Sequence, residues 1–404
     1  MRSSDAESGS AIAHAGRRGE RMHVTAAQRA RAVARVVPEG FPFRLERAAE
    51  FLQRLRDHPA LAPARRLCVL AGLCVACAAH AAGLDPGTMP AELAPLSSRS
   101  LLLDLAQAGS RIVAVGERGH ILLSDDRGQR WRQAKEVPTQ NLLTGVCFVD
   151  ERQGVAVGHD EIILITSDAG ETWSRTHYAP ENQQPLLDVL CSGRDLIAVG
   201  AYSTYMTSED GGRTWMRRKF EAEKISAPST RGAPGSAVEE GVSEEDEFGA
   251  DYHLNSIVAA SGARLYIAGE AGHLYRSDDG GVTWKELPSP YEGSFFGVLP
   301  LEGDSLLAYG LRGNLFRSDD DGLTWRAIET GTTAMLNDAV KLIGERIVIV
   351  GLSGVVLVSR DGGEHFRLAQ QADRKGLSAV LANTPAEIIT VGEAGLKRIA
   401  IEER

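Results

Sequence analysis

The stretch IAGEAGHLYRSDDGGVTW, Ile267–Trp284, recurs along the chain and decides the fold. It joins a β-rich segment ending in glycine, a polar loop, a second apolar segment and the turn pattern [ST]-x-D-x-G-x-[TR]-W. Successive closing aromatics of this turn are 42, 42, 69, 41 and 41 residues apart. The aspartates and closing aromatics are Asp126 and Trp131, Asp168 and Trp173, Asp210 and Trp215, Asp279 and Trp284, Asp320 and Trp325, and Asp361 with Phe366 in place of tryptophan.

A second marker keeps the same register. The β-rich segments end at Gly116, Gly158, Gly200, Gly269, Gly310, Gly351 and Gly392, again 41 or 42 residues apart except for one gap of 69. This period, filled with short strands, is typical of a four-stranded propeller blade. The sequence therefore predicts an all-β, seven-bladed β-propeller over residues 93–404. Because the last unit stops before its turn pattern, we expect Leu93–Leu105 to supply the missing outer strand.

The aspartate turn is explained by folding alone. Glycine adopts the positive φ that a tight turn needs, and aspartate and Ser/Thr oxygens bond turn amides that lack ladder partners. Tryptophan then opens the outer strand with a large apolar face. A calcium site is the alternative, but each turn offers fewer oxygens than the six to eight that calcium prefers. We expect no metal, no cofactor and no catalytic residue.

Turns of this kind are Asp-boxes, or bacterial neuraminidase repeats, which occur in sialidases and in many other propellers. The fuller unit, as in VAVGERGHILLSDDRGQRW at Val113–Trp131, resembles the photosystem II stability/assembly factor family. The resemblance covers about residues 93–404. It implies a non-catalytic lumenal or periplasmic propeller that helps to assemble a membrane protein complex. Blade two departs from the pattern with HDE at 159–161, and blade three with AYS at 201–203.

An export signal is predicted at residues 65–82. Arg65 and Arg66 precede an apolar run from Leu67 to Ala79, and Ala79-His80-Ala81 resembles a cleavage site. The run is too short for a membrane span of about 20 residues. We expect a periplasmic product; an uncleaved anchor is the alternative. The Arg/Ala-rich residues 1–64 are interpreted as a disordered extension or as sequence upstream of the true start.

Charge and cysteine content restrict the partners. Residues 1–82 carry a net charge of +6 and the rest −16, which argues against nucleic acid as the main partner. Cys147 and Cys191 are the two cysteines after the predicted export signal, and we expect both to be reduced, buried thiols. A single disulfide between them is the alternative.

The 69-residue gap adds an insertion, placed at residues 220–252. Its middle is rich in Ser, Pro and Gly. An acidic stretch follows, with Glu239, Glu240, Glu244, Glu245, Asp246 and Glu247. Low hydrophobicity and high charge predict a mobile loop. It is interpreted either as a tolerated insertion or as a contact for a basic partner.

Loops that follow the marker glycines share one face and form a candidate rim for protein binding. The rim residues are Glu117, Arg118, His159, Asp160, Tyr202, Glu270, Leu311, Arg312 and Glu393. A solvated edge without function is the alternative. We expect a monomeric platform that reaches the membrane through its partners. The competing function is a sialidase-like glycosidase, which needs three converging arginines and a tyrosine nucleophile. Tyr202 is the one tyrosine placed on the rim. Arg118 and Arg312 are its arginines, so a third is not found.

Overall fold

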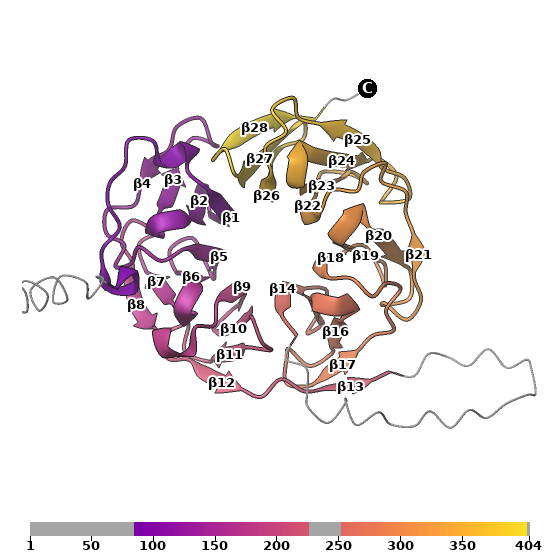
Figure 1. The fold of residues 1–404 in the computed structure, drawn as a ribbon, viewed down its shortest axis with the longest axis horizontal. Coiled ribbons are helices and arrows are strands. Elements are labelled where there is room, and N and C mark those ends of the chain that lie inside the picture. Colours follow the sequence, from indigo (N-terminus) through magenta and orange to yellow (C-terminus); the bar gives the residue numbers. More distant parts are fainter. Residues whose placement is uncertain (1–84, 226–251, 402–404) are drawn as a thin grey trace, which may run out of the picture. The chain divides into compact units, whose positions relative to one another are not determined.

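The computed structural model describes residues 85–225 and 252–401. The predicted extension, the predicted export signal and the acidic part of the insertion lie outside these residues. The described chain forms seven sheets arranged as a ring, antiparallel except for one added strand in blade four (Figure 1). The predicted all-β, seven-bladed propeller is confirmed.

The strands follow one another from the centre of the ring outward. Blades one to three consist of β1 (Leu102–Ala108), β2 (Arg111–Gly116), β3 (Ile121–Ser124) and β4 (Arg132–Gln133); β5 (Leu143–Phe148), β6 (Gly154–Gly158), β7 (Ile163–Thr166) and β8 (Ser174–His177); and β9 (Leu186–Ser192), β10 (Asp195–Gly200), β11 (Tyr205–Ser208) and β12 (Met216–Arg218). Blade four consists of β14 (Leu254–Ala259), β15 (Leu265–Gly269), β16 (Leu274–Ser277) and β17 (Trp284–Glu286), with β13 (Ala222–Lys224) outside β17. Blades five to seven consist of β18 (Phe295–Pro300), β19 (Leu306–Gly310), β20 (Leu315–Ser318) and β21 (Arg326–Ala327); β22 (Leu336–Lys341), β23 (Ile347–Gly351), β24 (Val355–Ser359) and β25 (Arg367–Gln370); and β26 (Leu377–Thr384), β27 (Glu387–Gly392) and β28 (Lys397–Ala400).

Helical structure in the described ranges is limited to single 3-10 turns. They are η2 (Pro86–Thr88), η3 (Ser97–Arg99), η4 (Glu117–Gly119), η5 (His159–Glu161), η6 (Pro180–Asn182), η8 (Glu270–Gly272), η9 (Leu311–Gly313) and η10 (Leu352–Gly354). Within those ranges, no helix has the length and apolar character needed to cross a bilayer.

The core lies between the blades, because each sheet is covered on both faces by its neighbours. The second strand of a blade is therefore almost continuously apolar, and β6, β15, β19 and β23 are buried at every residue. One cluster joins Val113 and Leu123 of blade one to Ala156 and Leu164 of blade two. Another closes the ring by packing Ile389 of blade seven against blade one.

The predicted closure of blade seven is wrong. Leu102–Leu105 belongs to β1, where Leu105 pairs with Ala114 of its own blade. The preceding Ser97–Arg99 forms η3, and its one ladder-like contact is the Leu396 amide donating to the Ser98 carbonyl oxygen at 3.0 Å. Among the described residues, blade seven has three strands and β28 is its outer edge.

The prediction of two reduced, buried cysteines is also wrong. Cys147 on β5 and Cys191 on β9 form a disulfide, with their Cα atoms 5.8 Å apart. Both side chains are half-buried. Their sequence separation of 44 is two residues longer than the 42 residues between Gly158 and Gly200. Cys147 pairs with Val155 in its blade, whereas Leu190 holds the equivalent place in the next blade and Cys191 follows it. Because successive side chains on a strand point to opposite faces, this offset turns the two thiols toward each other across the adjacent blades.

The insertion begins later than predicted. Ala222–Lys224 forms β13, which pairs in parallel with Trp284–Glu286 of β17. Phe220 packs among Tyr205, Tyr275 and Trp284, with ring centroids 5.0–5.8 Å apart. Its first residues are therefore part of blade four.

Candidate functional site

The loops that follow the marker glycines share an unusual backbone. The second residue of the loop has a positive φ in six blades, between 52° and 58°. These residues are Arg118, Asp160, Tyr202, Ala271, Arg312 and Ser353. The conformation costs free energy in non-glycine residues, and the repeat of one tight turn imposes it in blade after blade. All these loops connect the second strand to the third, so they lie on the same face of the ring (Figure 1).

The predicted rim residues divide into two groups. The acids brace the loops: the Leu101 amide donates to Glu117 Oε1 at 3.3 Å, Asn141 Nδ2 donates to Asp160 Oδ2 at 3.0 Å, and the His253 amide donates to Glu270 Oε2 at 3.3 Å. Glu393 Oε2 lies 3.8 Å from Lys375 Nζ. The exposed side chains of the rim are Arg118, His159, Tyr202, Arg312 and Glu393.

Tyr202 is the most prominent apolar surface of this group, with 53% of its area exposed. Its ring packs edge-on against His253, with centroids 5.1 Å apart. An exposed aromatic held in place and flanked on other blades by arginines is the composition that protein-binding surfaces favour. The exposed part of the rim is therefore suited to contact a protein.

A buried charge that the sequence did not single out lies beneath the rim. Glu161 closes the unusual HDE loop and is 1% exposed. Burial raises the pKa of its carboxyl, but hydrogen bonds from His177 and Asn182 and the charge of Arg217 hold that pKa below its usual value. His177 Nε2 lies 3.2 Å from Oε2, and Asn182 Nδ2 donates to Oε1 at 2.8 Å. Because Arg217 comes from blade three, the group ties two blades together. The departure HDE from the repeat was its sequence signal.

Three further acids were missed on the inner strands. Asp104, Asp188 and Asp338 are half-buried and hold the third position of the strands that begin at Leu102, Leu186 and Leu336. One carboxyl oxygen of each accepts the amide of the next blade, from Val146 at 2.7 Å, Ile257 at 2.9 Å and Val380 at 2.7 Å.

The environment of these inner acids disfavours their charge. Burial raises the pKa of Asp188 to about 6 and that of Asp338 to about 7. Burial and the charge of Asp188 also raise the pKa of Asp104 well above its usual value. Gly145, Ser256 and Ala379 occupy the matching positions of the blades whose amides are bound. The sequence pattern that could have indicated these acids is Leu-x-Asp at the start of the inner strand, which occurs in blades one, three and six.

The Asp-box oxygens are used within the turns. In the fourth blade Asp279 Oδ1 accepts the Thr283 amide at 2.9 Å and the Ser277 hydroxyl at 2.8 Å, and Oδ2 accepts the Thr283 hydroxyl at 2.6 Å. The Gly281 amide donates to Ser277 Oγ at 2.8 Å. Over the described ranges, no group of three or more His, Cys, Asp or Glu side chains is placed to hold a metal ion.

Comparisons with known proteins add to this geometry. A family model described as photosynthesis system II assembly factor YCF48 matches residues 129–245, and a BNR/Asp-box repeat model matches residues 275–286. Residues 129–245 are therefore similar to the repeats of that assembly factor family. No sequence among curated proteins matches the chain.

Solved structures show the same architecture. A structure of YCF48 bound to D1 peptide superposes with a TM-score of 0.57 at 16% identity, covering 79% of this chain and 99% of that one. YCF48 from Cyanidioschyzon merolae gives 0.57 at 15% identity, with 78% and 99% covered. The WD40 β-propeller domain of Doa1 gives 0.54 at 13% identity, with 79% and 97% covered. Since a WD40 propeller matches almost as well, these similarities show the propeller fold alone.

The predicted rim residues that the structure describes do not come together as they would in a sialidase. Arg118 and Arg312 stand on blades one and five, with several blades between them around the ring. Within the described ranges the Tyr202 hydroxyl has no carboxylate partner, although a tyrosine nucleophile needs an acidic residue behind it. The rim is therefore better suited to recognition than to glycoside hydrolysis.

Proposed function

We propose that this protein is an exported, non-catalytic platform that binds a subunit of a membrane protein complex during its assembly. The observation that carries the proposal is the ring of repeated loops on one face, in which strained turns present Arg118, Tyr202 and Arg312 to solvent while acids brace the backbone. A rigid scaffold that displays exposed loop side chains is the usual form of a recognition surface. The family of the repeats supports an assembly role, and one structural neighbour was solved with a D1 peptide.

Export is supported by the disulfide. A Cys147–Cys191 bridge persists in oxidising compartments and is rare in the reducing cytosol. The apolar run at residues 67–79, followed by Ala79-His80-Ala81, supports a signal removed after Ala81 or Ala82. N-terminal sequencing of protein recovered from the periplasm tests this directly: a start at residue 82 or 83 agrees, and a start at Met1 in the cytosol contradicts it.

Binding is tested by crosslinking in the native cells. The tagged full chain is crosslinked, and subunits of membrane complexes that co-purify are identified by mass spectrometry. We expect a defined subunit, lost in the R118E/R312E double variant and retained in R194E. Arg194 is an exposed arginine of blade three and serves as the matched control. If the double variant retains the same subunits as R194E, or if the preparation hydrolyses a sialoside, the platform on this face is refuted.

A further inference from the structure

The outer edge of blade seven is open within the described residues. In blade six, β25 pairs with β24 at this position, but β28 pairs only with β27. The amide of Leu396 points away from β27 and donates to the Ser98 carbonyl oxygen. Since main-chain direction alternates along a strand, the amides and carbonyls of Arg398 and Ala400 face the same outer side. Four main-chain groups therefore face the position that a fourth strand holds in the other blades.

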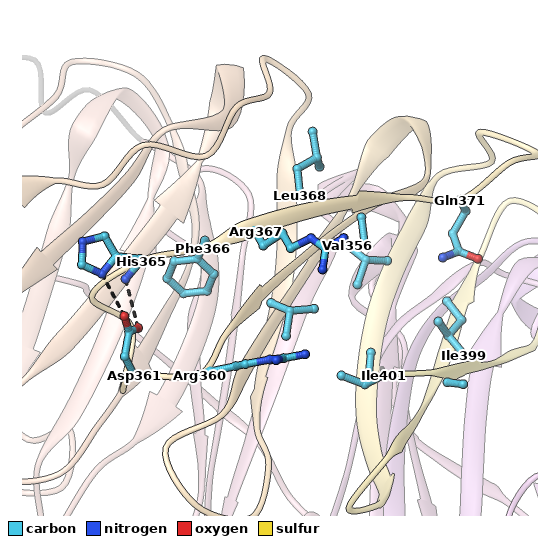
Figure 2. A pocket seen from close by; sticks show the side chains of 13 residues that line it. Val356, Arg360, Asp361, His365, Phe366, Arg367, Leu368, Gln371, Ile399 and Ile401 are labelled. Carbon is cyan, nitrogen blue, oxygen red and sulfur yellow. Dashed lines mark hydrogen bonds and ion pairs between the residues drawn. The ribbon is translucent and has the colours of Figure 1, made fainter. Parts of the chain in front are cut away.

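A groove of about 530 Å³ runs along this edge toward blade six (Figure 2). It lies between the outer strands of blade six and the end of blade seven. The apolar residues of its wall between blades six and seven are Val356, Val358, Ile399 and Ile401. Phe366 and Leu368 also border the groove, but they pack on the other face of blade six, against blade five. A strand added to β28 would point every second side chain into this wall and bury it there.

The groove also carries positive charge. Arg367 lines it, and Figure 2 shows its guanidinium group directed into the space between β25 and the end of blade seven. Among the described residues of the lining, the one acid is Asp361. It is held by His365, whose Nδ1 lies 2.8 Å from Oδ2 and whose amide donates to Oδ1 at 3.0 Å. Acidic side chains are therefore the complement of this surface.

Blade four shows that an outer edge of this propeller accepts an extra extended segment. There β13 adds to β17 in parallel over Ala222–Lys224, and the Ile225 amide donates to the Glu286 carbonyl oxygen at 3.0 Å. Edge addition of this kind obtains affinity from main-chain hydrogen bonds and specificity from pockets for alternate side chains. Blade seven offers the same two elements, without an occupant from the described chain.

We propose that an extended acidic segment of a partner protein binds as the fourth strand of blade seven. Its main chain pairs with Arg398 and Ala400 of β28, its apolar residues face Val358, and an acidic residue meets Arg367, which shares the face of Val358. The chain's own leading segment is directed elsewhere: from Ser98 it runs back along blade one to Asp85, which hydrogen-bonds Tyr178 after blade two. This surface is separate from the loop rim and does not depend on the function proposed for that rim.

The probe is a short fluorescein-labelled peptide in which valine and glutamate alternate, titrated into the full chain with fluorescence anisotropy as readout. We expect saturable binding. R367E should weaken it about five- to tenfold and should improve binding of the matching valine/lysine peptide. R194E, on blade three, should bind like the wild type. A peptide with N-methylated amides along one edge should not bind, because that edge can no longer pair with β28.

Each alternative has its own outcome. Equal binding by R367E and R194E would overturn the assigned charge contact, and equal binding by the N-methylated peptide would overturn strand addition. If a second copy is the occupant, sedimentation should show a dimer that the peptide does not dissociate. If the chain's own residues 1–84 are the occupant, the full chain should not bind the peptide. Either result refutes the proposal. Because R118E/R312E leaves blade seven unchanged, that variant should still bind the peptide, which separates this test from that of the rim.

Discussion

The sharpest prediction concerns Asp338, the inner-strand acid whose pKa is raised to about 7 by burial. In the unfolded chain an aspartate titrates near 3.8. Between these two values the folded protein binds a proton that the unfolded chain does not, so the free energy of unfolding falls as pH rises. The stabilisation is present at acidic pH and is lost as pH rises through about 7. From about pH 5 to about pH 8 the loss is about 2–3 kcal/mol, at about 1.4 kcal/mol for each pH unit below the folded pKa.

The comparison of D338N with the wild type isolates this effect. Asparagine stays neutral, so the free-energy difference between the two proteins should change by about 2–3 kcal/mol between about pH 5 and pH 8. Loss of the Val380 hydrogen bond shifts the difference by a constant and leaves its pH dependence intact. Burial lowers the pKa of His120, which opposes the trend in both proteins alike. Asp210 and Asp361, with pKa values of about 2, do not titrate in this range.

The assay is urea unfolding followed by tryptophan fluorescence at several pH values. D195N, at an exposed position on β10, is the control and should differ from the wild type by the same amount at every pH. If D338N shows the same pH slope as the wild type, the Asp338 carboxyl is ionised in the folded protein. The account of the inner acids as neutral hydrogen-bonding groups would then be wrong.

Three further predictions concern stability. C191S should lower the free energy of unfolding by about 2–4 kcal/mol, because the bridge closes a loop with a sequence separation of 44. A reductant should destabilise the wild type and leave C191S unchanged, and no effect on either protein would mean that the two thiols are free. D279A should cost about 1–3 kcal/mol in urea unfolding through its lost turn hydrogen bonds, while EDTA should not move the melting temperature of the wild type, since a shift would indicate a bound metal. Deletion of residues 226–249 should change the free energy of unfolding by less than about 0.5 kcal/mol, whereas F220A should lower it by about 3 kcal/mol. A large loss of stability on deletion would show that the insertion is packed.

The blade repeat was predictable because two independent markers had the same physical cause. A strand buried on both faces must be apolar throughout, as in β23, and it ends where the chain must turn at Gly351. A Cβ on that glycine would lie 2.1 Å from the Met335 carbonyl oxygen, so the strand-end position requires glycine. The periodic signal therefore reports both burial and close backbone approach, and it survives changes in every other residue.

The closure of the ring was not predictable in the same way. Of the predicted outer strand at Leu93–Leu105, only the part from Leu102 onward is a strand. Period-two alternation also does not tell which sheet a strand joins. The register with Arg111–Gly116 decides that, and it places the segment at the centre of blade one. The inner acids were missed for a related reason. An aspartate in a sequence is expected to be exposed, and the amide of the next blade that each carboxyl accepts becomes its neighbour only once the blades are packed.

The open edge of blade seven is protected without being closed. β28 is four residues long, Arg398 pairs with Glu387 at 2.9 Å, and Lys397 pairs with Asp373. Short edge strands that carry charge are the usual defence against pairing with a second copy. Two copies of this edge would bring their Arg398 side chains together, and the groove arginines would repel each other as well. An acidic strand meets no such repulsion, so the features that keep the propeller from self-association also select the charge of the partner that the edge accepts.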